Sequence, residues 1–557
     1  MKDKFYFTSF FYKHFDCLLL VLLCFLFGCF SVGYGQDVGW DITNYHLYNP
    51  FAFLTGRFSK DIMPATIHTF LNPLLDIPYY LLVRYFNNYP RFVAFVMGLP
   101  GGVLAFFVYK ISWFLLGRKG ARAEAIVATG VGITGAMVIS QLGMTSNEIP
   151  LAAILCASFY LLLKFLFEEQ TVSFCFWSAF LAGSAVGLKY TAAPFVIALT
   201  IAFLINLPWI KRPFRFLMFF ALGGLVGFLV TNGFFMWRLW HAYDNPFFPF
   251  LNGIFKSPFF APVNFDETRF YPHSLGQWWF YPFYWIHKSN GLVTEPRIYL
   301  ADARFAAAYI GTILLFVRFV WDCVFNRQDS AALREKAVLL VFVVIGYVLW
   351  LRFYSVLRYA VVLEVLAGVL VIYALRCYLK NGWVLVLSLG VLGSVMYKTH
   401  YPSWRRAPYT KQVIEIYNLP SVPENALIVY YEEGLAFLSM FFPKDAQFIG
   451  GIKLPINDYP GLLLQQLAKQ RNALPEQYYR YHFKEVSKQK ILAHDGPIYI
   501  VATPWFMMLH PITLTPYGLE RTHEPCPEFN ANINSYSDGW AMCRVQKLSS
   551  PVAQEPL

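Results

Sequence analysis

The sequence predicts an α-helical polytopic membrane protein of about eleven transmembrane helices, with the N-terminus inside and the C-terminus outside. A small extracytoplasmic α/β domain is expected at its C-terminal end. Of the 557 residues, 57% are hydrophobic and only 14% are charged, whereas about a quarter of the residues in soluble domains are charged. Apolar segments of roughly 17–25 residues recur along the chain, and basic residues mark alternate loops between them.

The first apolar segment is expected to be an uncleaved span, because it is long for a signal peptide and no clear cleavage site follows it. Segment 69–87 is also apolar. The basic loops all fall on the cytoplasmic side only if this segment lies at the membrane surface instead of crossing it. The predicted spans lie near residues 17–34, 91–109, 124–142, 149–167, 172–188, 191–208, 214–237, 304–321, 337–351, 359–378 and 383–398.

This topology gives the domain boundaries. Residues 1–398 form the predicted transmembrane domain, with two outer loops at 35–90 and 238–303, and residues 399–557 form the extracytoplasmic domain. In the latter, the apolar runs ALIVYY, AQFIG and PIYIVAT are typical of short buried strands, with helical spacing between them. That order predicts a small α/β domain with a partly parallel sheet.

The net charge of +12 indicates topology, not nucleic-acid binding, because the basic residues interrupt hydrophobic segments and do not cluster on a soluble surface. The bilayer, and anionic lipid in particular, is the expected partner. Seven of the nine cysteines lie in or beside spans. Cys526 and Cys543 lie in the outer domain, where an oxidising compartment makes them a candidate disulfide.

The first outer loop gathers acidic residues, which in a membrane protein indicates chemistry or ion handling. Asp37 and Asp41 are four residues apart, so a helical turn would place both carboxylates on one face, where one could act as a general base. There are two alternatives. The loop is simply solvated and its charges keep it out of the bilayer, or one Asp is the N-cap of a helix. His46, among Tyr and Asn residues, is either part of the site or a hydrogen-bonded structural residue.

Several cationic residues lie on the predicted outer side, although Lys and Arg are normally enriched in cytoplasmic loops. A set of this kind around a membrane-level cavity suits a lipid-linked phosphate, whereas each residue alone could extend to headgroups or pair with an acid. The set comprises Arg57, Lys189, Arg269, Arg352 and Arg358.

The opening of the chain resembles a known family. The pattern D-x3-Y-H-x-Y-N-x-F-A-F-L-x-G-R-F, followed by N-P-L-L-D-I-P-Y-Y, is similar to the start of the GT-C superfamily of polytopic glycosyltransferases. That superfamily includes the protein O-mannosyltransferases and the aminoarabinose transferases that modify lipid A. Asp41 matches the acidic position of the first outer loop, Gly56 a glycine, and Asn72-Pro73-Leu74 a proline segment at the membrane surface. The pair Arg358-Tyr359 resembles a family arginine that contacts lipid phosphate.

Two positions depart from the family pattern. Ile42 follows Asp41 where many members carry a second acid, so Asp37 is the alternative base. Asn72 stands where members usually carry a lysine. The phosphate-contacting role of the proline segment is therefore not carried over to this chain.

The resemblance implies a polyprenyl-phosphate sugar as donor and an inverting displacement at the anomeric carbon. Asp41, or Asp37, would deprotonate the acceptor hydroxyl, and Arg358, Tyr359, Lys189 and Arg57 would hold the donor phosphate. The acceptor, a glycan, lipid or protein, would lie near a further set of loop residues. That set comprises His46, Asp266, Glu267, Arg269 and His273. Two acids could hold a divalent metal, although nothing at ligand spacing requires one.

Two other functions remain open. A transporter or flippase of a lipid-linked saccharide would need carboxylates inside spans, of which Glu364 is the clearest. A polysaccharide polymerase or ligase would need arginines on large outer loops. The topology fits a bacterial inner membrane with the active site on the periplasmic side, for which an endoplasmic reticulum membrane facing the lumen is the eukaryotic equivalent.

Overall fold

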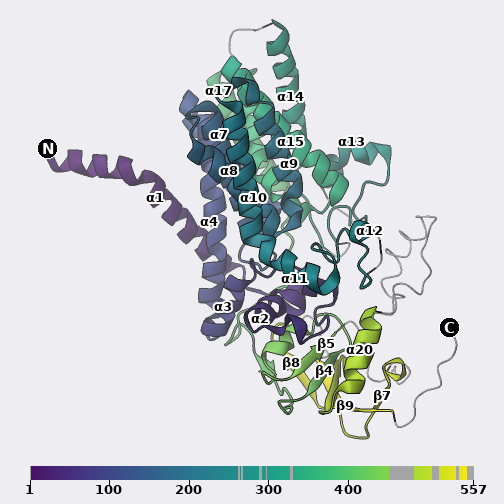
Figure 1. Cartoon of the computed structure of the whole chain (residues 1–557). Helices are drawn as coiled ribbons and strands as arrows, with labels where there is room; N and C mark the ends of the chain where they lie inside the picture. The colour runs from purple at the N-terminus through teal and green to yellow at the C-terminus, as the bar shows by residue number, and fades with distance from the viewer. Residues whose placement is uncertain are drawn as a thin grey trace. The chain divides into compact units, whose positions relative to one another are not determined.

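The computed structural model describes residues 2–260, 262, 264, 268–287, 291–295, 298–325, 330–450, 482–504, 514–534 and 539–548. Contacts divide the chain into two compact units (Figure 1). The helical unit comprises Met1–Tyr34, Ala94–Phe234 and Asp266–Trp404. The mixed unit comprises Gly35–Val93, Phe235–Phe265 and Arg405–Leu557. The predicted domain division at residue 398 stays a prediction.

The helical unit contains the long apolar helices. Its α-helices are α1 (Lys2–Gly33), α4 (Pro90–Leu115), α5 (Arg122–Ile133), α6 (Ala136–Ser140), α7 (Glu148–Phe167), α8 (Val172–Leu188), α9 (Ala193–Leu204), α10 (Pro213–Phe228), α13 (Leu275–Tyr284), α14 (Arg304–Phe325), α15 (Ser330–Phe353), α16 (Val361–Arg376) and α17 (Asn381–Lys398). Short 3-10 turns join several of them: η4 (Gly117–Lys119), η5 (Tyr190–Ala192), η6 (Leu207–Trp209) and η8 (Leu357–Ala360). A π-helical turn, η7 (Leu229–Gly233), follows α10.

Among the described residues, seven helical segments are long and apolar enough to cross a membrane, and three more apolar helices are shorter. The seven are His14–Gly33, Pro90–Leu115, Glu148–Phe167, Pro213–Tyr243, Arg304–Phe325, Ala331–Phe353 and Leu357–Arg376. The predicted multi-pass helical architecture is confirmed at this level, and the count of eleven spans stays a prediction. The α-helix described within segment 69–87 is α3 (Ile77–Phe86), which is too short to span.

One predicted span is interrupted. The apolar segment 124–142 forms two short helices, α5 and α6, which are separated at Thr134 and Gly135. The amides of Met137 and Val138 donate to the carboxylate of Glu364, at 3.0 and 2.9 Å. Because this carboxylate satisfies amides that a continuous helix would have bonded internally, the break is stable inside the unit.

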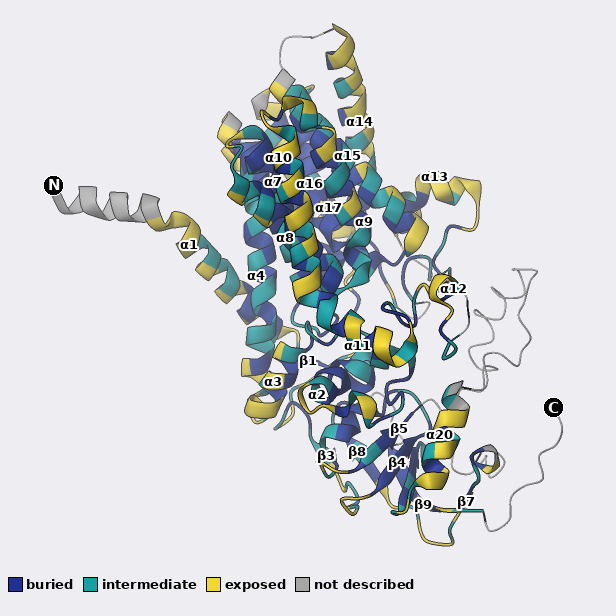
Figure 2. Ribbon diagram, in the orientation of Figure 1, coloured by how far each residue is buried: buried dark blue, intermediate teal, exposed yellow. Residues whose placement is uncertain are grey.

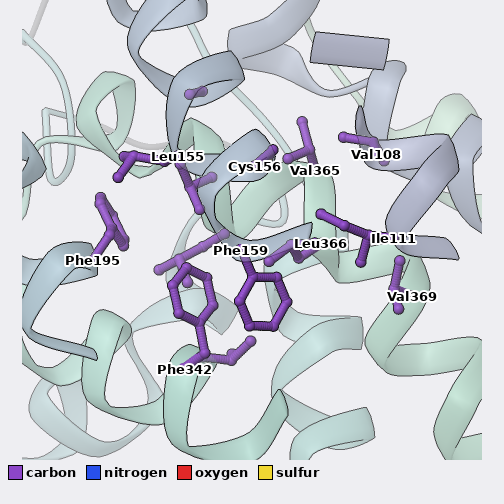
Figure 3. Close-up of a cluster of buried hydrophobic side chains, with 14 of the residues drawn as sticks. Val108, Ile111, Leu155, Cys156, Phe159, Phe195, Phe342, Val365, Leu366 and Val369 are labelled. Atoms are coloured by element: carbon purple, nitrogen blue, oxygen red, sulfur yellow. The ribbon is translucent and has the colours of Figure 1, made fainter. Parts of the chain in front are cut away.

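The core of the helical unit is closely packed. Figure 3 shows side chains from α4, α7, α9, α15 and α16 meeting in one cluster, in which the rings of Phe159 and Phe342 stack at 4.3 Å between centroids. In Figure 2 the buried residues fill the interior of this bundle, and exposed residues lie on outer faces such as that of α14. Between α8 and α10 the approach needs glycine, since a Cβ on Gly183 would collide with the carbonyl oxygen of Gly224.

The mixed unit combines short helices with a sheet. Its helices are α2 (Tyr48–Leu54), α3, α11 (Phe234–Tyr243), α12 (Asn252–Phe255) and α20 (His482–Ala493), with a π-helical turn η1 (Ile42–His46) and 3-10 turns η2 (Arg57–Ser59), η3 (Thr66–Phe70), η9 (Ala436–Met440) and η11 (Thr515–Tyr517). Its strands are β1 (Gln36–Asp37), β2 (Arg406–Ala407), β3 (Ile416–Tyr417), β4 (Leu427–Tyr430), β5 (Gln447–Ile449), β6 (Ile498–Ala502), β7 (Leu519–Arg521), β8 (Glu528–Ala531) and β9 (Trp540–Lys547).

The larger sheet has the order β3-β8-β9-β6-β4-β5, with β7 also paired to β9. Strands β5, β4 and β6 are parallel, and β9 is antiparallel to β6. The three predicted strand runs coincide with β4, β5 and β6. All four residues of β4 are buried, as expected for a continuous apolar run in the parallel part of a sheet.

The first outer loop is tied to C-terminal segments of the same unit. Strand β1 pairs with β2, and Ile62 forms a parallel bridge to Ile449. Pairing across almost 400 residues of sequence explains why the contacts group residues 35–93 with the sheet and not with the helical bundle.

Candidate active site

The two candidate bases lie on different elements. Asp37 belongs to β1, is buried with 7% exposure, and accepts the amide of Gly39 at 2.9 Å. Asp41 is half-buried and directly precedes the π-helical turn η1. The helical turn that would have placed both carboxylates on one face is therefore absent here, because residues 36–37 are drawn into a strand by pairing with residues 406–407.

His46 ends this π-helical turn and forms a buried pair with Asp76. Its Nδ1 lies 2.6 Å from Asp76 Oδ1, and the two residues are 2% and 4% exposed. Within the described part of the chain, His46 Nε2 has no hydrogen-bond partner. A carboxylate on Nδ1 fixes the orientation of an imidazole ring and leaves Nε2 as its reactive atom. π-helical turns also occur frequently at functional sites.

Aromatic rings hold this part of the loop. The ring of Tyr45 lies between His46 and His68, with centroid distances of 4.1 and 5.1 Å. His68 also meets Trp40 edge-on at 5.3 Å and is within 3.2 Å of the Asn44 amide. This packing fixes the segment that carries Asp41.

Arg57, predicted to contact the donor phosphate, is buried in a network inside the mixed unit. Its guanidinium donates to both oxygens of Asp61, at 2.6 and 2.9 Å, and to the carbonyls of Lys444 and Ala446. Four of its N–H groups are thus engaged and it is 2% exposed. Little of this side chain is left for a phosphate, so the structure favours a role for Arg57 in joining the loop to the sheet.

Asp61 has further donors around it. The Tyr48 hydroxyl and the Phe448 amide each donate to it at 3.0 Å. Burial raises the pKa of Tyr48 well above its usual range, and the charge of Asp61 adds to this rise, so Tyr48 stays protonated. Burial likewise raises the pKa of Asp61, against the hydrogen bonds from Arg57 and Phe448, which lower it.

In the helical unit, Lys189 and the Arg358-Tyr359 pair come together. Lys189 Nζ lies 2.5 Å from Glu148 Oε1, 2.9 Å from the Ser146 carbonyl and 5.4 Å from the centroid of the Tyr359 ring. Arg358 donates to the Tyr359 hydroxyl at 3.4 Å. Glu148 matches the charge of Lys189, which weakens Lys189 as a candidate for a phosphate.

The loop residues predicted on the acceptor side are only partly described. Arg269 is exposed, with its guanidinium 5.2 Å from the Phe270 ring, and His273 is exposed, with its backbone amide bonded to Gln277 at 2.6 Å. Asp266 and Glu267 lie outside the described residues. In the same region Arg352 donates to the Tyr271 hydroxyl at 3.2 Å.

The family-like motif positions have local structural explanations. Gly56 has a φ of +70°, a left-handed conformation that favours glycine, where the chain leaves α2. Asn72 Oδ1 accepts the amide of Leu74 at 3.1 Å, which forms an Asx turn at the proline segment. In the C-terminal part of the mixed unit, Cys526 and Cys543 form a disulfide, as predicted.

Glu364, the intramembrane carboxylate that transport would need, is part of a fully buried cluster. Besides the amides of α6, it lies 3.7 Å from the Arg304 guanidinium, which also bonds Asp302 and the Thr134 carbonyl. All three charged residues have 0% exposure. A carboxylate bonded by amides and a guanidinium fits a structural role, which removes the main intramembrane feature that favoured transport.

Several of these partners were not singled out as site residues from the sequence. Asp76 is 30 positions from His46, and Glu148 is 41 positions from Lys189, so no local spacing connects either pair. Asp61, at i+4 from Arg57, is the exception: that spacing is a usual signal of an ion pair.

Comparisons with known proteins found one matching family and several similar solved structures. Residues 80–237 match the family described as dolichyl-phosphate-mannose-protein mannosyltransferase. No curated protein matches the sequence. The structure of ArnT from Cupriavidus metallidurans bound to undecaprenyl phosphate has a TM-score of 0.48 and 14% identity, over 96% of this chain and 98% of that one. Its apo structure has a TM-score of 0.49 and 10% identity over the same shares.

The oligosaccharyltransferase of Archaeoglobus fulgidus has a TM-score of 0.42 and 13% identity, over 86% of this chain and 68% of that one. The family match falls on the segment that begins in α3 and ends in α11. It confirms the resemblance to polytopic membrane glycosyltransferases that the sequence predicts.

Proposed function

We propose that the chain is a GT-C-type glycosyltransferase that moves a sugar from a polyprenyl-phosphate donor to an acceptor hydroxyl, with inversion at the anomeric carbon. The observation that carries the proposal is the match of residues 80–237 to the mannosyltransferase family. The seven apolar helices support a donor held by a lipid tail. We place the protein in the bacterial inner membrane, with its active site on the periplasmic side.

In this reaction the acceptor oxygen attacks the anomeric carbon while the bond from that carbon to the phosphate oxygen breaks. The acceptor proton passes to a carboxylate, and the leaving group is the polyprenyl phosphate. We assign the proton to Asp41 by preference. It is half-buried and so reachable, whereas Asp37 is buried in β1 with one oxygen already bonded to Gly39.

Negative charge gathers on the leaving phosphate as the glycosidic bond breaks, and a cation fixed near it lowers the barrier. Arg358 is our first candidate for this role, with Tyr359 beside it. Lys189 is a weaker candidate because Glu148 already matches its charge. Arg57 is assigned to the fold, since its donors are engaged by Asp61 and two carbonyls.

The acceptor side is proposed to involve His46, Arg269 and His273, and a divalent metal remains an open addition. His46 is of particular interest because its Nε2 lacks a hydrogen-bond partner among the described residues.

The proposal is tested by profiling glycans and glycolipids of cells that carry Asp41→Asn or Asp37→Asn, at protein levels equal to wild type. Asp244→Asn, which changes an exposed carboxylate of the second loop, is the matched control. We expect an under-glycosylated product to accumulate with Asp41→Asn alone. Accumulation with Asp37→Asn alone would move the base to Asp37. An unchanged profile in both variants would refute glycosyl transfer by this loop.

A further inference from the structure

A pocket in the mixed unit is lined by one arginine side chain, that of Arg238. Its walls come from α2, from the segment between η2 and the proline segment, and from α11. Five aromatic side chains and Arg238 line it, the aromatic ones being Tyr48, Phe53, Phe58, Phe235 and Tyr243. Neither the sequence motifs nor the proposed transfer step uses this arginine.

Arg238 is held by rings and not by an acid. Its guanidinium lies 5.1 Å from the centroid of Phe58 and 5.9 Å from that of Phe53. Among the described residues it makes no ion pair or hydrogen bond, and it is half-buried. Stacking on aromatic faces orients a guanidinium while leaving its N–H groups in the ring plane free to donate.

The acid in the same pocket does not neutralise Arg238. Asp61 also lines the pocket, but its oxygens accept from Arg57, Tyr48 and the Phe448 amide, so its charge is matched within that network. The positive charge of Arg238 therefore has no partner in the described chain. A half-buried cation of this kind is most stable with an oxyanion ligand.

A second polar group of the pocket wall is unsatisfied. The amide nitrogen of Asn49 donates to the carbonyls of His68 and Leu71, at 2.8 and 3.3 Å. Its Oδ1 is buried and has no donor among the described residues. Buried polar atoms are normally paired, so an unpaired acceptor in the wall of the pocket that also holds Arg238 indicates a place where a ligand hydroxyl supplies the missing donor.

We propose that this pocket binds the oxyanion of an acidic sugar, a carboxylate or phosphate that forms a two-pronged contact with Arg238. The pocket is too small for a sugar ring, so the ring stays at its mouth. The identification of the ligand as a sugar rests on the proposed glycosyl transfer. The existence of an oxyanion site rests only on Arg238 and the rings that hold it; the unpaired Oδ1 of Asn49 is an acceptor and suits a hydroxyl of the ligand. The site would make the protein selective for acidic over neutral sugars.

The test is a binding measurement that needs no turnover. The full-length protein in detergent is titrated with glucose, glucuronate and glucose 6-phosphate, and Kd is obtained by ligand-observed nuclear magnetic resonance. The variants are Arg238→Gln, Arg238→Lys and Arg215→Gln. Arg215 is the matched control because it also lies over a phenylalanine ring, at 6.0 Å from Phe219, but is exposed on α10.

We expect wild type to bind both acidic sugars at least about tenfold more tightly than glucose, because a charge-assisted pair contributes this much or more. Arg238→Gln should remove the preference, Arg238→Lys should keep part of it, and Arg215→Gln should leave it unchanged. Equal affinity of wild type for all three sugars would overturn the proposal, as would a preference retained in Arg238→Gln.

Undecaprenyl phosphate is titrated in parallel to separate the two sources of an oxyanion. If Arg238→Gln weakens its binding while leaving glucuronate binding unchanged, the pocket takes the phosphate of the lipid and the acidic-sugar assignment is refuted. Since no transfer is measured, a failed glycosyltransferase assay with intact acidic-sugar binding would refute the proposed function and leave the oxyanion site standing. Unfolding midpoints of all variants must match that of wild type, and Arg238→Lys serves as the test if Arg238→Gln does not fold.

Discussion

The buried pair of Arg57 and Asp61 gives the sharpest stability prediction. Two bonds join the guanidinium to the carboxylate, and further bonds run from Arg57 to two carbonyls beside β5. Replacing Asp61 by Asn leaves a buried guanidinium without its counter-charge. Removal of one partner from a buried pair costs about 3–5 kcal/mol. For a unit of this size, that loss lowers the unfolding midpoint by roughly 6–20 °C.

The assay is thermal unfolding of the full-length protein in detergent, followed by intrinsic fluorescence. A matched control lies next to the pair: Lys60 and Asp445 also form an ion pair, at 3.4 Å, but with side-chain exposures of 33% and 69%. Exposed pairs contribute about 0–1 kcal/mol, so Asp445→Asn should shift the midpoint by less than about 4 °C.

The double variant Arg57→Leu/Asp61→Leu adds a second check. Replacing both members of a buried pair by apolar residues is often neutral, so the double variant should be more stable than either single variant. If Asp61→Asn melts at the wild-type temperature, the network does not hold the first outer loop to the sheet, and the structural role given to Arg57 fails.

Three further predictions concern other parts of the chain. Gly183→Val should force α8 away from α10 and lower the unfolding midpoint, at a cost of about 1–3 kcal/mol. Gly390→Val is the control, because no atom lies near its Cβ position, and it should leave the midpoint unchanged. Equal midpoints of the two variants would contradict the close packing. Asp76→Asn should reduce glycosyl transfer at unchanged protein level. The reason is that a neutral amide holds His46 less firmly than the carboxylate oxygen that lies 2.6 Å from its Nδ1. Full activity would show that the pair is dispensable. Cys526→Ser should lower the unfolding free energy by about 3 kcal/mol, as expected for the loop of 17 residues that the disulfide closes. Adding reductant to wild type should have the same effect. An unfolding midpoint insensitive to both would argue against the disulfide.

The helical part of the fold was largely predictable because apolar length is a local property of the sequence. The predicted segments 149–167 and 172–188 coincide with α7 and α8 to within one residue. Segment 124–142 is apolar throughout its middle, yet it breaks at Thr134, because Glu364 and Asp302 bond amides of α6 from far along the chain. Hydropathy contains no information on such partners.

The candidate site was predictable in its residue types and less so in its geometry. The acidic loop and its histidine were found from composition, whereas the pairing of β1 with β2 separates Asp37 from Asp41 in structure. The partner of His46 is 30 residues away, and the carbonyls that engage Arg57 are almost 400 residues away. Long-range contacts of this kind decide which charged residues are structural and which remain available for ligands.

Arg238 is a further residue whose surroundings could not be predicted from the sequence. Arg238 is the first residue of the predicted loop 238–303, but it was not among the outer cations named from the sequence. Only the packing of α11 beside Phe53 and Phe58 shows that this arginine is held by rings and lacks an acidic partner in the described residues.

The most direct test of the central claim is cleavage of a polyprenyl-phosphate sugar by the purified protein. Synthetic donors are incubated with wild type and Asp41→Asn in the presence of a membrane lipid extract, and released polyprenyl phosphate is measured. The account predicts release by wild type and at least about 100-fold slower release by Asp41→Asn, as expected for loss of a general base. Release at equal rates would exclude Asp41 as the base. No release from any donor, together with movement of lipid-linked sugar across proteoliposome membranes, would contradict glycosyl transfer and indicate a flippase.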